Sequence, residues 1–244
     1  MILTTCAACA APLALDAPRC VRCKVRYCDS TCQHDHYVGR PETDWARRLA
    51  MSVLGSGLHD ARNYEDALSV QEAELSTERR LGASKSSILF AQANIAITYE
   101  CLGRLEQALQ MKRHVYSETL KLYGKEHEET LQAANNYAAG FLALQRYQEA
   151  KSRLRRTMPM ARRVLGDSND LTLRMRKVYA EALYQDPGAT LDDLREAVNM
   201  LEELERTARR VLGGAHPTTE SIEYHLREAR AVLRASEGTP SGGA

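Results

Sequence analysis

The 244-residue sequence has almost no net charge, no long apolar run and only three Phe and Trp residues together. Its 33 Lys and Arg against 32 Asp and Glu leave a net charge of +1. This balance argues against a nucleic-acid-binding protein, because such proteins usually carry a clear basic excess. No apolar stretch approaches the ~20 residues that cross a bilayer. We therefore expect a soluble protein that does not span a membrane.

Catalytic signatures are missing as well. The sequence contains no Gly-x4-Gly-Lys-Ser/Thr phosphate loop, no Gly-x-Ser-x-Gly elbow and no His-Glu-x2-His zinc helix. We therefore predict that the protein is not an enzyme. The apolar start of the chain lacks the positive charge that precedes the apolar region of a signal peptide. We expect an intracellular protein, cytoplasmic or nuclear.

Cysteine is confined almost entirely to the N-terminus. Six of the seven cysteines lie between Cys6 and Cys32, and Cys101 stands alone. In a reducing compartment, clustered thiols are more often metal ligands than disulfides. A Cys-x2-Cys pair places two thiolates at one tetrahedral zinc, and two such pairs occur here. The sequence therefore predicts zinc binding at the N-terminus, whereas the apolar helical surroundings of Cys101 predict a buried side chain.

The cysteine spacing resembles that of the MYND-type zinc finger, a small protein-interaction module that holds two zinc ions. The resemblance covers residues 6–37 and rests on two Cys-x2-Cys pairs and a Tyr-Cys-x3-Cys-Gln stretch. It implies that the first, second, fifth and sixth cysteines hold one zinc. These are Cys6, Cys9, Cys28 and Cys32.

The second zinc site of the finger is incomplete in this sequence. The resemblance assigns to it Cys20, Cys23 and a later His and Cys, but those later positions hold an arginine and an aspartate. The finger is therefore shortened, and His34 or His36 is left as a substitute ligand. On a helix, His36 shares a face with Cys32 and is the predicted ligand. Solvated histidines are the alternative.

From about residue 45 the sequence becomes helical and repetitive. A glycine recurs at spacings of 42, 42 and 47 residues, and an alanine recurs at 41, 42 and 47. A fixed period of about 20–50 residues predicts a solenoid of repeats. The glycines are Gly82, Gly124, Gly166 and Gly213, and the alanines are Ala67, Ala108, Ala150 and Ala197.

Each repeat is predicted to contain two antiparallel helices. The recurring glycine ends the second helix in the left-handed conformation. A histidine or asparagine follows three residues later and is expected to act in the turn. A threonine three residues further on is the expected N-cap of the next helix, and a small residue marks the close approach of the two helices. The threonines are Thr130, Thr172 and Thr219, and the small residues are Ala96, Ala138 and Ala180.

The repeats resemble the tetratricopeptide repeats of the kinesin light chain class. The resemblance rests on Ala134-Asn135-Asn136-Tyr137-Ala138, Arg163-Val164-Leu165-Gly166 and Val211-Leu212-Gly213, and it covers residues 45–235. It implies a mainly α fold, an α-solenoid of four helix pairs plus a last helix. A small N-terminal zinc-binding module would precede the solenoid, and a disordered tail would follow at residues 236–244.

In a repeat solenoid of this class the first helices line a concave groove. The resemblance implies that asparagines there bind an extended peptide, since an amide both donates and accepts hydrogen bonds. The cations Arg174 and Lys177 favour an acidic ligand. The alternative is that these residues are polar side chains on a solvated face and bind no peptide. The predicted peptide-binding residues are Asn94, Gln132, Asn135, Asn136, Arg174 and Lys177.

The sequence thus predicts a non-catalytic adaptor that binds zinc through its N-terminus and proteins or peptides through its repeats. The alternative is a subunit or remnant of a larger regulatory enzyme, without catalysis of its own. That enzyme would be a methyltransferase of the kind that carries a MYND finger, or a member of the ubiquitin pathway. The basic stretch at residues 151–156, together with Arg162 and Arg163, is expected to form a solvated outer face rather than a nucleic-acid site.

Overall fold

A computed structural model describes residues 41–238, and this part of the chain consists of nine helices with no strand. The mainly α fold is therefore confirmed for these residues. The predicted zinc finger at residues 6–37 lies outside the described residues. The helices are α2 (Pro41–Asp60), α3 (Tyr64–Arg80), α4 (Lys85–Cys101), α5 (Leu105–Tyr123), α6 (Glu128–Ala143), α7 (Tyr147–Leu165), α8 (Asp170–Tyr184), α9 (Leu191–Val211) and α10 (Pro217–Gly238).

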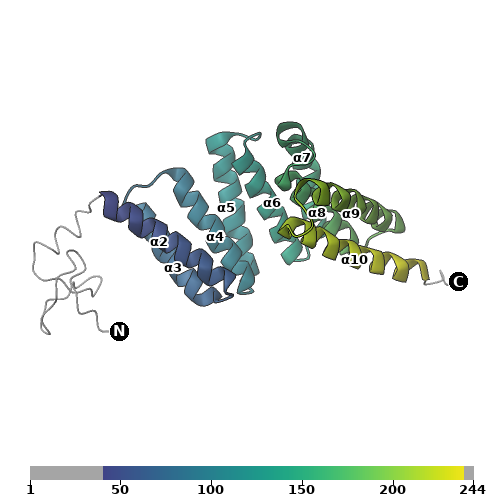
Figure 1. Cartoon of the computed structure of the whole chain (residues 1–244), viewed down its shortest axis with the longest axis horizontal. Coiled ribbons are helices and arrows are strands. Elements are labelled where there is room, and N and C mark those ends of the chain that lie inside the picture. The colour runs from purple at the N-terminus through teal and green to yellow at the C-terminus, as the bar shows by residue number, and fades with distance from the viewer. Residues whose placement is uncertain (1–40, 239–244) are drawn as a thin grey trace, which may run out of the picture.

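The helices form antiparallel pairs that stack side by side into a curved array (Figure 1). Each helix packs mainly against its neighbours in the sequence, and α6, α8 and α10 also contact one another in succession. Such nearest-neighbour packing is typical of a repeat solenoid. The four pairs α2–α3, α4–α5, α6–α7 and α8–α9, followed by α10, agree with the predicted repeats in number and order. The predicted boundary at residue 235 was wrong, because α10 continues through residues 236–238, which were expected to belong to the disordered tail. None of these helices is long and apolar enough to cross a membrane.

Alanines allow the close approach of the helices. The predicted small residues of the first helices and the recurring alanines of the second helices are at most 1% exposed. A side chain with only a Cβ lets two helix backbones come near each other without leaving a void. The small-residue prediction is confirmed at Ala96, Ala138 and Ala180, and the recurring alanines Ala67, Ala108, Ala150 and Ala197 prove to be buried in the same way.

The turns between repeats have the predicted glycine geometry. Gly82, Gly124, Gly166 and Gly213 adopt φ angles of 64°, 81°, 91° and 90°. A Cβ is strained in this left-handed region, which explains why glycine recurs there.

The helix starts differ from the prediction, because the N-caps lie three residues earlier than the threonines. His127 accepts a hydrogen bond from the Glu129 amide at 3.2 Å, and Asn169 accepts one from the Leu171 amide at 2.8 Å. The repeated histidine and asparagine are thus turn and capping residues.

The three threonines are buried inside the first turn of the helix that they were expected to cap. Thr130 Oγ1 donates to the Thr119 carbonyl at 3.2 Å, and Thr219 Oγ1 donates to the Gly213 carbonyl at 2.8 Å. These two bonds tie the start of one helix to the end of the preceding one. The N-cap assignment of the threonines was therefore wrong, since the hydroxyls of Thr130 and Thr219 satisfy carbonyls of the previous repeat.

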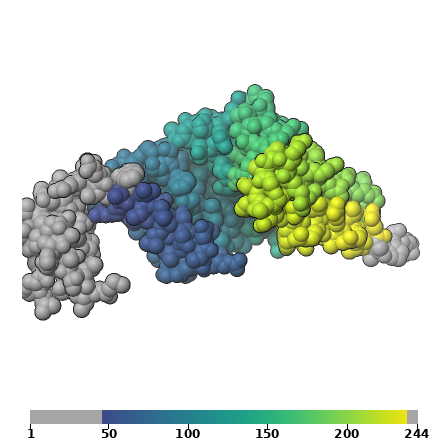
Figure 2. All heavy atoms as spheres, viewed as in Figure 1, coloured from purple at the N-terminus to yellow at the C-terminus, as the bar shows by residue number. Residues whose placement is uncertain are grey.

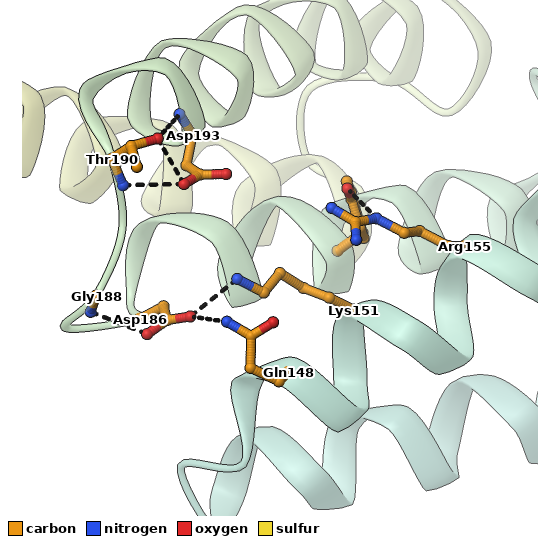
Figure 3. A network of polar contacts seen from close by, with 8 residues as sticks. Gln148, Lys151, Arg155, Asp186, Gly188, Thr190 and Asp193 are labelled. Atoms are coloured by element: carbon orange, nitrogen blue, oxygen red, sulfur yellow. Dashed lines mark hydrogen bonds and ion pairs between the residues drawn. The ribbon is translucent and has the colours of Figure 1, made fainter.

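The loop between α8 and α9 accommodates the longer last repeat, as expected, and carries a buried ion pair (Figure 3). Asp186 accepts hydrogen bonds from Lys151 Nζ at 2.8 Å, Gln148 Nε2 at 2.9 Å and the Gly188 amide at 3.0 Å. The hydrogen bond from Lys151 is the main reason why the pKa of Asp186 lies below its ordinary value. This ion pair joins α7 to the loop of the next repeat.

The basic stretch on α7 is not a uniformly solvated face. Lys151 is only 5% exposed, and Arg155 Nε donates to the Tyr179 hydroxyl at 3.0 Å. The guanidinium of Arg153 lies over the rings of Tyr116 and Tyr137, 5.0 and 5.1 Å from their centres. The prediction of a solvated outer face was therefore wrong for Lys151, which is buried, and holds for Arg155 and Arg156, which are exposed.

The core is continuous in the C-terminal half and divided in the N-terminal half. One cluster of buried apolar residues extends from Leu109 on α5 to Ala229 on α10. Two smaller clusters lie between α3 and α4 and among α4, α5 and α6. The first helices α4 and α6 contact each other less extensively than α6 and α8 do. The N-terminal repeats are therefore spread apart on the face of the first helices.

Candidate peptide-binding groove

A groove with a volume of about 950 Å³ opens where the first helices are spread apart. Figure 2 shows this face of the molecule hollowed between the blue N-terminal helices and the yellow-green C-terminal ones, with teal helices in the floor. The lining residues come from α2 to α6 and, at one end, from α8.

Four of the six predicted peptide-binding residues line this groove. They are Asn94 on α4, Gln132 and Asn136 on α6, and Arg174 on α8. Gln132 Nε2 donates to Asn136 Oδ1 at 3.1 Å, and Arg174 Nη2 donates to Gln132 Oε1 at 2.9 Å. The structure thus brings three of them into one hydrogen-bonded row across two repeats.

The other two predicted residues, Asn135 and Lys177, do not line the groove. Asn135 is buried, and its Oδ1 has no hydrogen-bond partner among the described residues. Lys177 lies further along α8, with Nζ 3.3 Å from Ser221 Oγ and 3.7 Å from Glu181 Oε2. The repeat register placed both on the concave side but could not show which neighbours cover them.

A polar cluster beside Lys177 fills the C-terminal end of the concave face. The Tyr184 hydroxyl lies 2.8 Å from His225 Nδ1, and Glu181 Oε2 lies 3.6 Å from His225 Nε2. Burial lowers the pKa of His225 to about 4, raises the pKa of Tyr184 to about 12 and raises the pKa of Glu181. These side chains pair with one another, so the open part of the face is the N-terminal groove.

The groove also has an apolar wall that the sequence analysis missed. Leu49 on α2 and Phe90 and Ile97 on α4 line it, and Phe90 is 59% exposed. The sequence Ile88-Leu89-Phe90 could have indicated an exposed apolar side chain, because three consecutive residues cannot all face one side of a helix. Leu89 is buried, so Phe90 must project elsewhere.

Two carboxylates of α3 make one end of the lining acidic. Glu78 accepts a hydrogen bond from Arg48 Nη1 of α2 at 3.3 Å. Glu74 is only 6% exposed, and its pKa is raised mainly by burial, against a hydrogen bond with Ser52 that lowers it. These residues were also missed, although their spacing of four residues places them on one helix face.

No metal site is found in the part of the chain that the structure describes. Residues 46–237 hold no group of three or more His, Cys, Asp or Glu side chains placed for a metal ion. The predicted zinc ligands lie outside the described residues, and their role stays a prediction. They are Cys6, Cys9, Cys20, Cys23, Cys28, Cys32 and His36.

Cys101 is exposed, so the prediction of a buried side chain was wrong. It is the last residue of α4, and its Sγ lies 3.6 Å from Nε2 of His59 near the end of α2. The apolar neighbours in sequence are misleading because α4 is apolar on several faces.

Comparison with known proteins agrees with an all-helical solenoid of the tetratricopeptide kind. Residues 130–170 match the tetratricopeptide repeat family. One similar crystal structure contains nearly identical TPR-like repeats, of the kinesin light chain kind, from Podosopora anserina. The match covers 78% of this chain and 88% of that chain, with a TM-score of 0.62 and 19% sequence identity. A second match is the crystal structure of BtubC (BKLC) from P. vanneervenii. It covers 88% of this chain and 89% of that chain, with a TM-score of 0.55 and 14% sequence identity. At these identities the structural likeness establishes the fold.

Curated relatives include proteins called clustered mitochondria protein homologues. The one from Coccidioides immitis is 23% identical over 168 residues, which is 66% of this chain and 13% of that protein. The one from Aspergillus fumigatus is 24% identical over 132 residues, or 53% of this chain and 10% of that protein. The chain therefore matches only a small part of the length of these relatives.

Proposed function

We propose that the protein is a non-catalytic scaffold that binds an extended segment of a partner protein in the groove. The observation that carries this proposal is the set of side-chain amides of Asn94, Gln132 and Asn136 lining an open groove with an apolar wall. An amide can pair with both the N–H and the C=O of a peptide unit. The apolar wall supplies surface whose burial stabilises the complex.

The proposal does not depend on an acidic ligand. That preference was inferred from Arg174 and Lys177, whose positive charges already have acidic neighbours. Arg174 Nε lies 3.0 Å from Asp170 Oδ2, and Lys177 lies beside Glu181. Surface charges that are already paired add little selectivity for an anion.

Replacing Asn136 with alanine is expected to weaken peptide binding about twofold to tenfold, because a hydrogen bond is worth ~0.5–1.5 kcal/mol. Asn136 is only partly buried, so the melting temperature should stay within about 2 °C of the unaltered protein. A labelled nonapeptide selected from a random library against the full chain serves as the probe, and fluorescence anisotropy measures its affinity.

Asn199→Ala is the matched control, since Asn199 lies exposed on α9, away from the groove. This control should bind the peptide with unchanged affinity. Equal affinity of Asn136→Ala and the unaltered protein would remove the proposed peptide contact at that position.

We also propose that the N-terminal cysteines bind zinc, on the strength of their spacing. The first predicted site has four thiolates, whereas Cys20 and Cys23 lack the later His and Cys that would complete the second site. We expect one tightly held zinc per chain, lost on Cys28→Ser and less affected by Cys20→Ser, because affinity comes from a complete coordination shell. Native mass spectrometry counts the metal. Two ions would show that a histidine completes the second site, and none would contradict the proposal.

The name of the curated relatives supports one further element of the proposal, a partner connected with mitochondria. The cytoplasm or nucleus remains the predicted location of this chain. Imaging of a fluorescent fusion of the full chain, with a mitochondrial marker, distinguishes these compartments. A diffuse signal that ignores the marker would count against a mitochondrial partner.

A further inference from the structure

The end of the groove between α2, α3 and α4 has more negative than positive charge. Glu74 and Glu78 project from α3, and Arg48 of α2 is the cation near them. Arg48 pairs with Glu78, and Glu74 has no ion-pair partner among the described residues. At the other end, Glu129 and Arg174 line the groove, and Arg174 is paired with Asp170. Both cations of the lining are therefore already engaged.

Glu74 is a buried carboxylate with an incomplete set of partners. Its one neighbour that favours the charged form is the Ser52 hydroxyl, while burial and Glu78 both raise its pKa. Charged groups buried without a counter-charge destabilise a protein, so they are usually paired. A cation entering the groove would supply the missing partner, because Glu74 lies in its lining.

The apolar wall lines the same groove as this carboxylate. Leu49 precedes Ser52 by about one helical turn on α2, and Phe90 and Ile97 face the same groove from α4. A lysine or arginine side chain has an aliphatic stem that packs on apolar surface and a charged end that reaches a carboxylate. An aromatic ring adds attraction for a cation.

We infer that this end of the groove is a subsite for a lysine or arginine side chain of the bound segment, flanked by large apolar residues. The inference rests on the proposed function, since it names the kind of peptide that the groove selects. The partner is a protein with an exposed basic and apolar stretch. Charge complementarity argues for this choice, because the charged groups of the lining that have no ion-pair partner among the described residues are carboxylates.

Three pools of labelled nonapeptides test the subsite on the full chain. All three pools have the same flanking positions, which are drawn from Leu, Ile, Val and Phe. They differ only in the central residue, which is Lys, Met or Glu. We expect the Lys pool to bind about tenfold more tightly than the Met pool, and the Glu pool to bind most weakly, because a buried charge pair discriminates strongly between signs. Fluorescence anisotropy at low salt measures the three affinities.

Two glutamate variants show where the selectivity arises. Glu74→Gln keeps the shape of the side chain and should lower the affinity for the Lys pool about tenfold while leaving the Met pool unchanged. Glu220→Gln is the matched control, since Glu220 is exposed on α10, outside the groove. It should change neither affinity.

The outcomes separate this inference from the proposed function. Equal or tighter binding of the Glu pool, still weakened by Asn136→Ala, would overturn the cation subsite and leave the groove intact. The absence of binding by any pool would overturn both. An equal loss for all pools with Glu74→Gln would also overturn the subsite. If that variant fails to fold, the comparison of the three pools on the unaltered protein still decides the question.

Discussion

Unfolding in urea is expected to show that Asp186→Ala lowers the free energy of unfolding by about 2–3 kcal/mol. The substitution leaves Lys151 buried without its partner, and it also removes acceptors for Gln148 and the Gly188 amide. Breaking a deeply buried ion pair costs ~3–5 kcal/mol. The smaller loss of about 2–3 kcal/mol is expected here because the loop lies at the edge of the array, where water can reach the ammonium group of Lys151 once Asp186 is removed.

Asp192→Ala is the control for this experiment. Asp192 is exposed on α9 and lies 3.7 Å from Arg195, so its removal should change stability by less than about 0.5 kcal/mol. The double variant Lys151→Met with Asp186→Ala should be more stable than Asp186→Ala alone, because no unpaired charge remains. A double variant as unstable as the sum of the two single changes would contradict the ion-pair explanation.

The same pair has a defined pH dependence. Lys151 holds the pKa of Asp186 below its ordinary value of 3.8, so the stabilisation is fully present above about pH 4. It is lost as the pH falls through the lowered pKa and the carboxylate gains a proton. The difference in stability between the unaltered protein and Asp186→Ala should therefore shrink below pH 4, as measured by urea unfolding at several pH values.

Replacing Ala138 with leucine should destabilise the central repeats by about 1–3 kcal/mol or more. Ala138 is fully buried in the continuous core, with Tyr137 and Phe141 of the same helix in that cluster. Three added carbon atoms would force the helices apart, because protein cores have few voids. Loss of the far-ultraviolet circular dichroism signal on heating reports the change.

Ala231→Leu gives the matched control, since Ala231 is exposed on α10. Leucine is a good helix former, so this variant should melt within a few degrees of the unaltered protein. If Ala138→Leu melts at the same temperature as Ala231→Leu, the assignment of Ala138 to the close helix contact is wrong.

Much of the fold could be predicted because repeat structure is local. Glycine at a positive φ angle, small residues at helix contacts and a regular period each act within one repeat or between neighbours. The sequence therefore determined the helix pairs, the turns at Gly82, Gly124, Gly166 and Gly213, and the buried alanines. The helix caps were assigned less well, since two polar residues in each turn could serve and the choice depended on the preceding helix.

The candidate site depended on tertiary structure to a greater extent. The repeat register, taken from the family resemblance, indicates on which side of its own helix a residue lies, and it placed Asn94, Gln132, Asn136 and Arg174 on the concave side, where they line the groove. It does not indicate how far apart two repeats stand, because that distance is set by side-chain packing across several helices.

Only the packed structure therefore decided that the groove opens in the N-terminal half, that Asn135 is covered and that Cys101 is exposed. It also decided that Glu74 lies in the groove without a counter-charge among the described residues. The sequence determined the repeating unit, whose contacts are short-range, and the tertiary structure decided the site, whose residues come from six helices that meet only after the repeats have stacked.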